Sequence, residues 1–228
     1  LAISQRLLED GYKVIGISRS LSDWLSEISK RFPEAFVFRP FDFARLDQIR
    51  EFATSLTKEF SPIYGLINNA AVGTDGVLAT MHEKDIHYSI ALNLESPIIF
   101  TKYIARNMLM HRSGRIINIS SIIGQTGQFG QSNYAAAKAG MHGFTMSLAR
   151  EVARKGVTVN SVSPGYVKSA MTDAVPQDLR DQILASVPVG RIGQPEDIAR
   201  AVAFLCAEDS GYITGINLPV NGGLFISF

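Results

Sequence analysis

The feature that most constrains the fold is a regular alternation of short apolar runs with longer helical patterns along the chain. The runs are rich in β-branched and aromatic residues, as buried strands are. They are KVIGIS (13–18), AFVFRP (35–40), YGLINNA (64–70), GRIINISS (114–121), VTVNSVSP (157–164) and INLPVNGG (216–223). This alternation predicts an α/β fold, a doubly wound parallel sheet in one domain over residues 1–228. In such sheets ligands bind at the carboxyl ends of the strands, so functional residues are expected just after each run.

The first residues, LAISQRLLEDGYKVIGISRS, predict a helix followed by a strand. Ile3, Leu7 and Leu8 lie on one helical face, and Gly11 stands where a helix ends. Helix then strand is the second half of a βαβ unit, so we expect about 15 to 25 further residues upstream, a strand and a glycine-rich turn. That first strand, absent from this sequence, is central in the usual strand order. Without it, two half-sheets should face an unfilled slot with unpaired backbone groups.

Composition and charge exclude several classes of function. Lys and Arg number 22 against 21 Asp and Glu, and a net charge of +1 offers no field for nucleic acid or an anionic membrane. No apolar run is long enough to span a bilayer. Cys206 is the single cysteine, so we expect a buried thiol in a reducing, cytoplasmic compartment. The histidines, His82, His87, His111 and His142, lack metal-ligand spacing, which predicts surface or loop positions and no metal site.

The segment SSIIGQTGQFGQSNYAAAKAG carries the strongest chemical signal. Tyr134 and Lys138 are four residues apart among alanines, so on a helix their side chains share one face. Alone, the pair also fits a solvated lysine beside a packed tyrosine. The preceding strand ends in two serines, a glycine-bearing loop follows, and the helix is expected to begin near Ser132 or Asn133 as its cap.

This pattern resembles the short-chain dehydrogenase/reductase family, which has a serine thirteen residues before a Tyr-x-x-x-Lys motif. Ser121 fits that spacing and Ser120 does not. Other segments that resemble family motifs, in the family's order, are LINNAA (66–71), ALNLESP (91–97), VSPGYVKSAMT (162–172), GQPEDIARAVAFL (193–205) and YITGINLPVNGG (212–223). The last two are similar to the 3-oxoacyl-acyl-carrier-protein reductase branch. The resemblance covers nearly the whole chain and implies a Rossmann-like fold and an NAD(P)-dependent oxidoreductase.

The resemblance and the chemistry together assign four catalytic residues. Ketone reduction leaves an alkoxide that must be protonated, and Tyr134 can supply the proton if Lys138 stabilises its phenolate. The resemblance implies that Ser121 donates a hydrogen bond to the substrate carbonyl and that Asn93 positions a water between Lys138 and solvent. Two alternatives stay open, namely that Ser121 only caps a strand end and that Asn93 is a structural residue at a helix kink.

The resemblance also implies NADP(H) in preference to NAD(H). Arg19 follows the strand at residues 13–18, where family members that favour NAD carry an acidic residue, and a guanidinium suits a 2′-phosphate. An ordinary exposed arginine is the alternative. The other cofactor contacts that the resemblance implies are Ser18, Asp42, Phe43, Asn69, Ala70, Tyr134, Lys138, Pro164, Gly165, Val167 and Ser169.

Residues 166–191 resemble the family's substrate lid, which implies that they set substrate choice, although the sequence does not decode it and an ordinary amphipathic helix is the alternative. Arg115 and Lys155 match a basic patch that could meet an acidic acyl carrier, although a solvated surface fits both equally. The first hypothesis is a homotetrameric NADPH-dependent reductase of 3-oxoacyl thioesters linked to acyl carrier protein. A reductase or dehydrogenase of a free small alcohol, sugar or steroid is one alternative, and a catalytically silent binding or assembly module is another.

Overall fold

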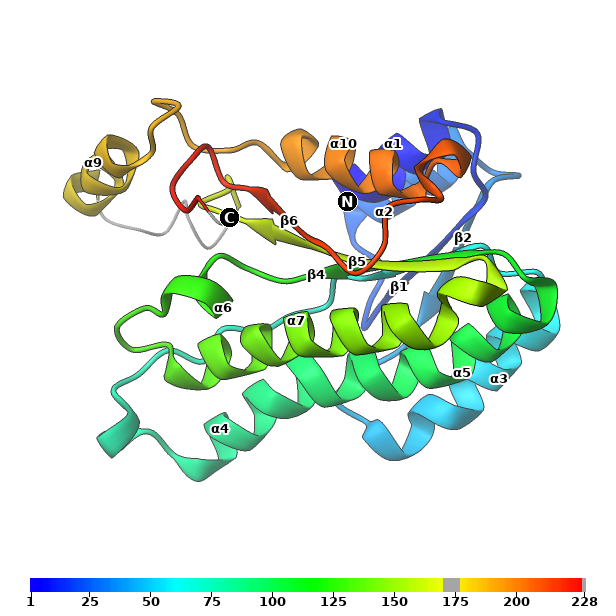
Figure 1. The fold of residues 1–228 in the computed structure, drawn as a ribbon, viewed down its shortest axis with the longest axis horizontal. Helices are drawn as coiled ribbons and strands as arrows, with labels where there is room; N and C mark the ends of the chain where they lie inside the picture. Colours follow the sequence, from blue (N-terminus) through cyan, green and yellow to red (C-terminus); the bar gives the residue numbers. More distant parts are fainter. Residues whose placement is uncertain (170–176, 227–228) are drawn as a thin grey trace.

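The structure is a computed structural model that describes residues 1–169 and 177–226 (Figure 1). Its strands all pair in parallel and are β1 (Val14–Ser18), β2 (Phe36–Pro40), β3 (Gly65–Asn68), β4 (Gly114–Ile119), β5 (Val157–Pro164) and β6 (Asn217–Val220). Its α-helices are α1 (Ala2–Glu9), α2 (Asp23–Arg31), α3 (Ile49–Phe60), α4 (Glu83–Ile90), α5 (Ser96–His111), α6 (Ile123–Thr126), α7 (Ser132–Val152), α9 (Gln177–Ser186) and α10 (Pro195–Cys206). Each strand lies inside one of the apolar runs.

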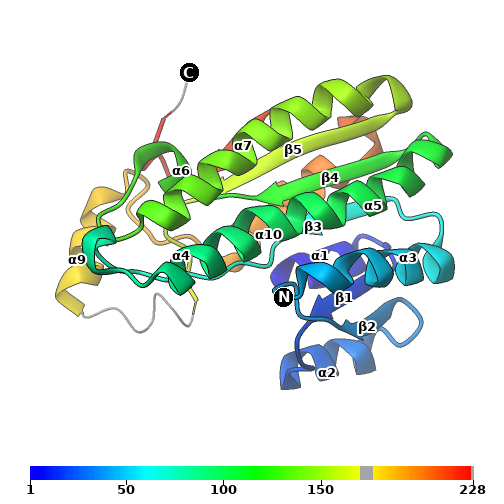
Figure 2. The same cartoon turned by 90° about the horizontal axis from the view of Figure 1, so that it is seen from below.

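The strands lie between two layers of helices, with α1 and α10 on one face and α3, α5 and α7 on the other (Figures 1 and 2). Successive residues of β4 serve the two faces, because side chains alternate along a strand. Ile116 packs with Ile104 of α5, whereas Ile117 packs with Val202 of α10, and all four side chains are buried. The predicted doubly wound α/β fold is confirmed.

The hydrogen bonding of the sheet is divided in two. Within residues 1–169 and 177–226, β1 pairs with β2, and β3, β4, β5 and β6 form a separate four-stranded ladder. The sequence predicted two half-sheets, and the division falls where it was expected, between β1 and β3. The smaller part has its own apolar cluster, in which Leu25 and Ile28 of α2 pack with Phe36. A Cβ at Gly16 would lie 2.6 Å from the Phe36 ring, so only glycine fits that point of β1.

The carboxyl end of α10 joins the two parts. The hydroxyls of Tyr12, which precedes β1, and Tyr64, which precedes β3, both donate to the main-chain oxygen of Cys206, over 3.2 Å and 2.8 Å. The two rings are stacked, with centroids 6.1 Å apart. Helix carbonyls at this end lack partners within the helix, so these side chains satisfy them.

Arg115 caps the same end of α10, and the prediction that it contributes to an exposed basic patch is wrong. Its Nε donates to Ala207 over 3.3 Å and its Nη2 to Glu208 over 3.0 Å, in both cases to the main-chain oxygen. The guanidinium also lies over the Tyr64 ring, and only 6% of the residue is exposed. Burial follows because three neighbouring segments converge on one cation at a helix carboxyl end.

The predicted environments of the cysteine and the histidines are confirmed for some residues and wrong for one. Cys206 is buried as expected, and burial raises the pKa of its thiol to about 12. His82, His87 and His111 are exposed, whereas His142 lies half-buried within α7, so the prediction of a surface or loop position is wrong for His142. In the part of the chain that the structure describes, no helix combines the length and apolarity needed to cross a membrane.

Candidate active site

Strand β4 and the loop after it bring Ser121 to the amino end of α7. Pairing with the β5 segment continues past β4, because the Ser120 amide donates to Val162 over 2.8 Å and the Ile122 amide to Pro164 over 3.1 Å. The loop then packs closely on α7, since a Cβ at Gly124 would lie 2.8 Å from the main-chain carbon of Lys138.

Helix α7 begins one residue earlier than the sequence suggested. Gln131 is the N-cap and Ser132 the first helical residue, so the expectation of Ser132 or Asn133 as the cap is wrong. The side chain of Asn133 is engaged elsewhere: its Nδ2 donates to Thr74 Oγ1 over 2.8 Å, and its Oδ1 accepts the Tyr134 amide over 2.8 Å. These bonds fasten the start of α7 to the loop that follows β3.

Tyr134 lies beside Ser121, whose hydroxyl favours the ionised form of the phenol. Burial raises the pKa of the Tyr134 phenol above its usual value, and this effect outweighs the opposite influence of Ser121. The prediction that Lys138 favours the phenolate stays a prediction, because the raised pKa follows from burial of the phenol. Tyr134 therefore holds its proton at neutral pH, as a general acid must.

Lys138 lies one helical turn after Tyr134, on the same face of α7 as predicted. Its Nζ is 5.5 Å from the centroid of the Tyr134 ring and donates to the Ile119 main-chain oxygen over 2.8 Å. Only 3% of Lys138 is exposed, and burial lowers the pKa of its ammonium group to about 8. The cation is thus held between the end of β4 and the phenol.

Asn93 lies in a π-helical turn, Ala91–Glu95, between α4 and α5. Its carboxamide pairs with both main-chain groups of Val72, accepting over 3.0 Å and donating over 2.8 Å, and also donates to Ser89 over 3.2 Å. A Cβ at Gly140 of α7 would lie 2.9 Å from Leu94, so the turn lies against α7 near Lys138. The structural role considered as an alternative for Asn93 is present in these bonds.

His142 was not predicted as a site residue, although it belongs to the polar cluster around Lys138. Its Nε2 lies 2.7 Å from Ser120 Oγ and 3.3 Å from Ser163 Oγ. Burial, followed by the charge of Lys138, lowers the pKa of the imidazole. The signal was available, because His142 is four residues after Lys138 and so falls on the same helix face.

Two of the predicted cofactor residues line one pocket at the carboxyl ends of β1 and β2. The pocket has a volume of about 370 Å³ and is lined by Arg19, Pro40, Phe41, Asp42, Arg45 and Gln48. Guanidinium groups beside an open pocket suit a phosphate. The pocket therefore fits the phosphate-bearing end of a nicotinamide dinucleotide.

Three more of the predicted residues line a second pocket, of about 210 Å³, at the ends of β3 and β5. Asn69, Pro164 and Val167 contribute to it, together with Ile119 and Lys168. Ile119 is also the residue whose carbonyl holds the Lys138 ammonium. Both pockets lie where doubly wound sheets bind their ligands, so the donor set and its placement fit a bound nicotinamide cofactor.

The remaining predicted cofactor residues line neither of these two pockets. Ser18 Oγ donates to the Ser20 carbonyl over 2.8 Å, and Ala70 is exposed beside Asn69. The Phe43 ring packs against Phe100 with centroids 5.1 Å apart, and its place near the adenine stays a prediction. Gly165 approaches Asn221 closely, since a Cβ there would lie 2.9 Å from the Asn221 Cα. Ser169 is half-buried after the bridge between Val167 and Gly193.

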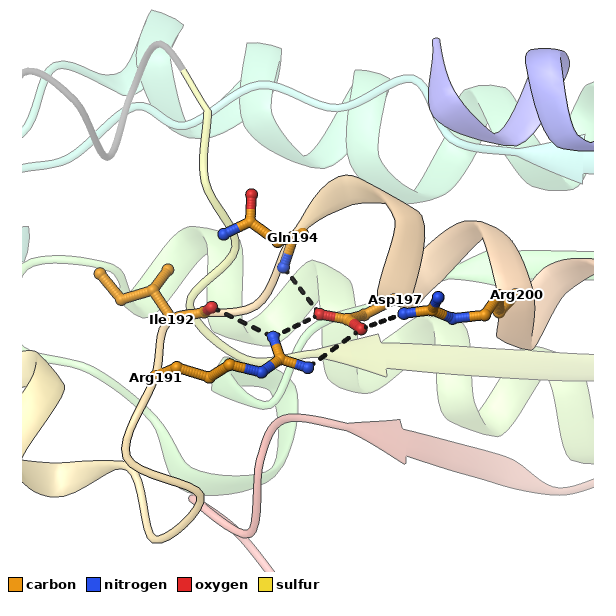
Figure 3. Close-up of polar contacts among 5 residues, drawn as sticks. All are labelled: Arg191, Ile192, Gln194, Asp197 and Arg200. Atoms are coloured by element: carbon orange, nitrogen blue, oxygen red, sulfur yellow. Dashed lines mark hydrogen bonds and ion pairs between the residues drawn. The ribbon is translucent and has the colours of Figure 1, made fainter.

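Part of the predicted lid, residues 170–176, lies outside the described residues. The rest contains α9 and ends at Arg191, which forms an ion pair with Asp197 in the first turn of α10 (Figure 3). Asp197 also accepts from Arg200 over 2.6 Å and from the Gln194 amide over 2.8 Å. The hydrogen bond from Arg191 is the largest cause that holds the pKa of the Asp197 carboxyl well below its usual range. The end of the lid segment is thereby fixed to α10.

Nearly the whole chain is similar to known proteins. Residues 1–225 match the family model described as enoyl-(acyl carrier protein) reductase. The chain is 45% identical to an acetoacetyl-CoA reductase of Allochromatium vinosum, over 99% of this chain and 93% of the relative. It is 44% identical to an acetoacetyl-CoA reductase of Cupriavidus necator, over 98% and 92%. It is 42% identical to a 3-oxoacyl-[acyl-carrier-protein] reductase of Escherichia coli, over 99% and 92%. The chain therefore belongs to the short-chain dehydrogenase/reductase family and is an NAD(P)-dependent oxidoreductase.

Proposed function

We propose that this protein reduces the 3-oxo group of an acyl thioester to a 3-hydroxy group, with NADPH as the hydride donor. The observation that carries the proposal is the arrangement of Ser121, Tyr134 and Lys138 at the end of β4: a protonated phenol lies beside a serine hydroxyl, with a buried ammonium group 5.5 Å from its ring centroid. The activities of the relatives, acetoacetyl-CoA reductase and 3-oxoacyl-[acyl-carrier-protein] reductase, support the same reaction class.

Each residue then has a defined task. NADPH, when bound, supplies a hydride to the carbonyl carbon of the substrate. Ser121 donates a hydrogen bond to the carbonyl oxygen and orients it. Tyr134 transfers its proton to that oxygen as negative charge develops, and Lys138 stabilises the phenolate that remains. Asn93 positions a water between Lys138 and solvent, through which the phenol regains a proton.

The preference for NADPH rests on Arg19. Its guanidinium lines the pocket at the end of β1, where a 2′-phosphate can accept paired hydrogen bonds from it. Asp42 and Asn69 bind the adenosine half and the nearby ribose, while Pro164, Gly165, Val167 and Ser169 hold the nicotinamide.

Replacing Tyr134 with Phe tests the reaction, because it removes the proton donor and keeps the ring. Turnover of acetoacetyl-CoA by Tyr134→Phe should fall by about 10²- to 10⁴-fold with cofactor binding retained. Tyr103→Phe, which removes a phenol from α5 outside the site, is the matched control and should keep full activity. Turnover within a few-fold of wild type in Tyr134→Phe would show that the assigned mechanism is wrong.

Two acyl carriers remain candidates. The hypothesis of a carrier-protein substrate relies on surface cations, and with Arg115 buried only exposed Lys155 remains of the predicted pair. Coenzyme A is the second candidate, favoured by the acetoacetyl-CoA reductases among the relatives. Lys155→Glu should lower kcat/KM several-fold for a carrier-protein-linked substrate and leave acetoacetyl-CoA unaffected. Lys155→Met is its neutral control, and no change for either substrate would overturn the carrier contact.

We further propose a homotetramer in a reducing cytoplasmic compartment. Large apolar side chains such as Met110, 79% exposed, and Phe204, 53% exposed, offer surface that self-association could bury. The lone buried thiol of Cys206 agrees with a reducing compartment. Sedimentation equilibrium of the purified chain measures the assembly directly, and a monomeric mass would contradict it.

A further inference from the structure

A second arginine, Arg45, lines the same pocket as Arg19. Arg19 follows β1, whereas Arg45 lies in the turn after the neighbouring strand β2. The turn is well defined: the Arg45 amide donates to the Asp42 carbonyl over 3.0 Å, and the Ala44 amide donates to Asp42 Oδ1 over 3.0 Å. The Gln48 amide in turn donates to the Arg45 carbonyl over 3.1 Å. Arg45 is thus presented at the pocket by a hydrogen-bonded turn.

The guanidinium groups of both arginines are free to bind a ligand. Across residues 1–169 and 177–226, neither Arg19 nor Arg45 has a side-chain hydrogen bond or an ion pair. Other arginines in this half of the molecule are paired with acids, as Arg31 is with Glu9. Within the same described residues, Arg50, exposed on α3, is also unpaired, but only Arg19 and Arg45 of the unpaired arginines in this half line the pocket.

Arg45 determines the net charge of the pocket. Among the lining residues, Arg19, Arg45 and Asp42 carry charge. The formal charges of Arg19 and Asp42 cancel, so without Arg45 the pocket is neutral. A phosphate monoester carries roughly −1.5 to −2 charges near neutral pH and needs a net positive site. Only with Arg45 does the pocket become positive.

We propose that Arg45 is a second specificity-determining residue for NADPH, binding the 2′-phosphate together with Arg19. This inference rests on the NADPH preference proposed above and adds a residue that the resemblance did not assign. Two planar guanidinium groups, one from each neighbouring strand end, can divide the phosphate oxygens between them. Neither group contributes to binding of NADH, whose ribose carries a hydroxyl at that position.

The test is a set of binding titrations on the purified chain, followed by the fluorescence of NADPH and, separately, of NADH. Arg45→Ala should weaken NADPH binding by about 10- to 100-fold, as expected for the loss of charge-assisted hydrogen bonds, and change NADH binding less than about twofold. Arg45→Gln, which keeps a polar side chain but removes the positive charge, should weaken NADPH binding to a similar extent. Arg50→Ala, an exposed arginine of α3 outside the pocket lining, is the matched control and should bind both cofactors as wild type does.

Competition with small ligands assigns the effect to the phosphate. Adenosine 2′,5′-bisphosphate should displace NADPH from wild type better than adenosine 5′-monophosphate does, and Arg45→Ala should remove most of that advantage. An Arg45→Ala variant that binds NADPH as wild type does, while Arg19→Ala loses it, overturns the role of Arg45 and leaves the proposed NADPH preference intact. Equal losses of NADPH and NADH also overturn it. A wild type without preference for NADPH overturns both proposals.

Discussion

The ammonium group of Lys138 is bound to the main-chain oxygen of Ile119 over 2.8 Å, which fastens the face of α7 that carries Tyr134 and Lys138 to the last residue of β4. Ser121 follows Ile119 by two residues, and Tyr134 precedes Lys138 by one helical turn. This hydrogen bond therefore helps to set how the Tyr134 phenol, the Ser121 hydroxyl and the Lys138 cation lie relative to one another.

Burial of the Lys138 charge should lower the stability of the fold at neutral pH. Burial lowers the pKa of Lys138 from 10.5 to about 8, so between these values the unfolded chain binds more protons than the folded one. Stability should rise with pH across that window, by on the order of 3 kcal/mol from this group. Lys138→Met should be inactive, yet more stable than wild type at pH 7. Urea unfolding from pH 7 to above pH 10 should show that the stability difference between Lys138→Met and wild type becomes smaller. A difference that is constant with pH would contradict this prediction.

His142 should carry its proton on Nε2. The Ser120 hydroxyl donates to the Lys138 carbonyl and the Ser163 hydroxyl to Asn217 Oδ1, so both serine oxygens are left to accept from the imidazole. Nitrogen NMR of the ring distinguishes the two tautomers, and a proton on Nδ1 alone would refute the assignment.

The same residue predicts a loss of stability in acid. The pKa of His142 is lowered in the folded state, so the unfolded chain binds the proton first as pH falls below the ordinary value of 6.5. Wild type should therefore lose stability below that pH, and His142→Gln should lose less. His87→Gln, on the exposed surface of α4, should follow wild type. Parallel curves for wild type and His142→Gln would show that the imidazole is not desolvated as described.

Asp197 should stabilise α10 only while it is ionised. Its carboxylate accepts from the Gln194 amide and pairs with Arg191 and Arg200 (Figure 3). Asp197→Asn should cost about 1 kcal/mol at pH 7, the usual effect of a lost helix cap. Because the pKa of Asp197 is lowered in the folded state, wild type should lose this contribution as pH falls below the ordinary carboxyl value of 3.8. Glu196→Gln, its exposed neighbour, should have little effect; equal losses in the two variants would argue against the cap.

Arg115 should matter for stability and not for recognition of a partner. Arg115→Met removes the charged hydrogen bonds to the carbonyls of Ala207 and Glu208, which keep only the Ser210 and Gly211 amides as donors, and should lower the free energy of unfolding by about 2 kcal/mol. Arg150→Met, at an exposed position of α7, should change it little. Thermal and urea unfolding measure both variants, and a fully stable Arg115→Met would show that the helix end does not need this cap.

The sequence could predict the strands and the shared face of Tyr134 and Lys138 because both depend on local pattern: apolar runs define strands, and a spacing of four defines a helix face. The division of the sheet was also predictable, since strand order follows from the succession of elements. The burial of Arg115 was not, because it depends on the end of α10, more than ninety residues later in the chain. Asn133 was expected as a cap and instead binds Thr74, a partner that only the folded chain brings near. His142 was set aside because histidines were judged by metal-ligand spacing, whereas its contacts are with serines on two strands.

The π-helical turn at Ala91–Glu95 should make the proposed active site sensitive to the deletion of a single residue. Such a turn accommodates one residue more than regular α-helix does. Deleting a single residue between Ala91 and Glu95 would let α4 and α5 fuse into one regular helix, a change that by itself costs little. Because the wide turn already absorbs the extra residue, the helices on either side would keep their relative orientation, and only the residues of the turn would shift. The carboxamide of Asn93 could then no longer reach Val72 while Leu94 kept its place against Gly140.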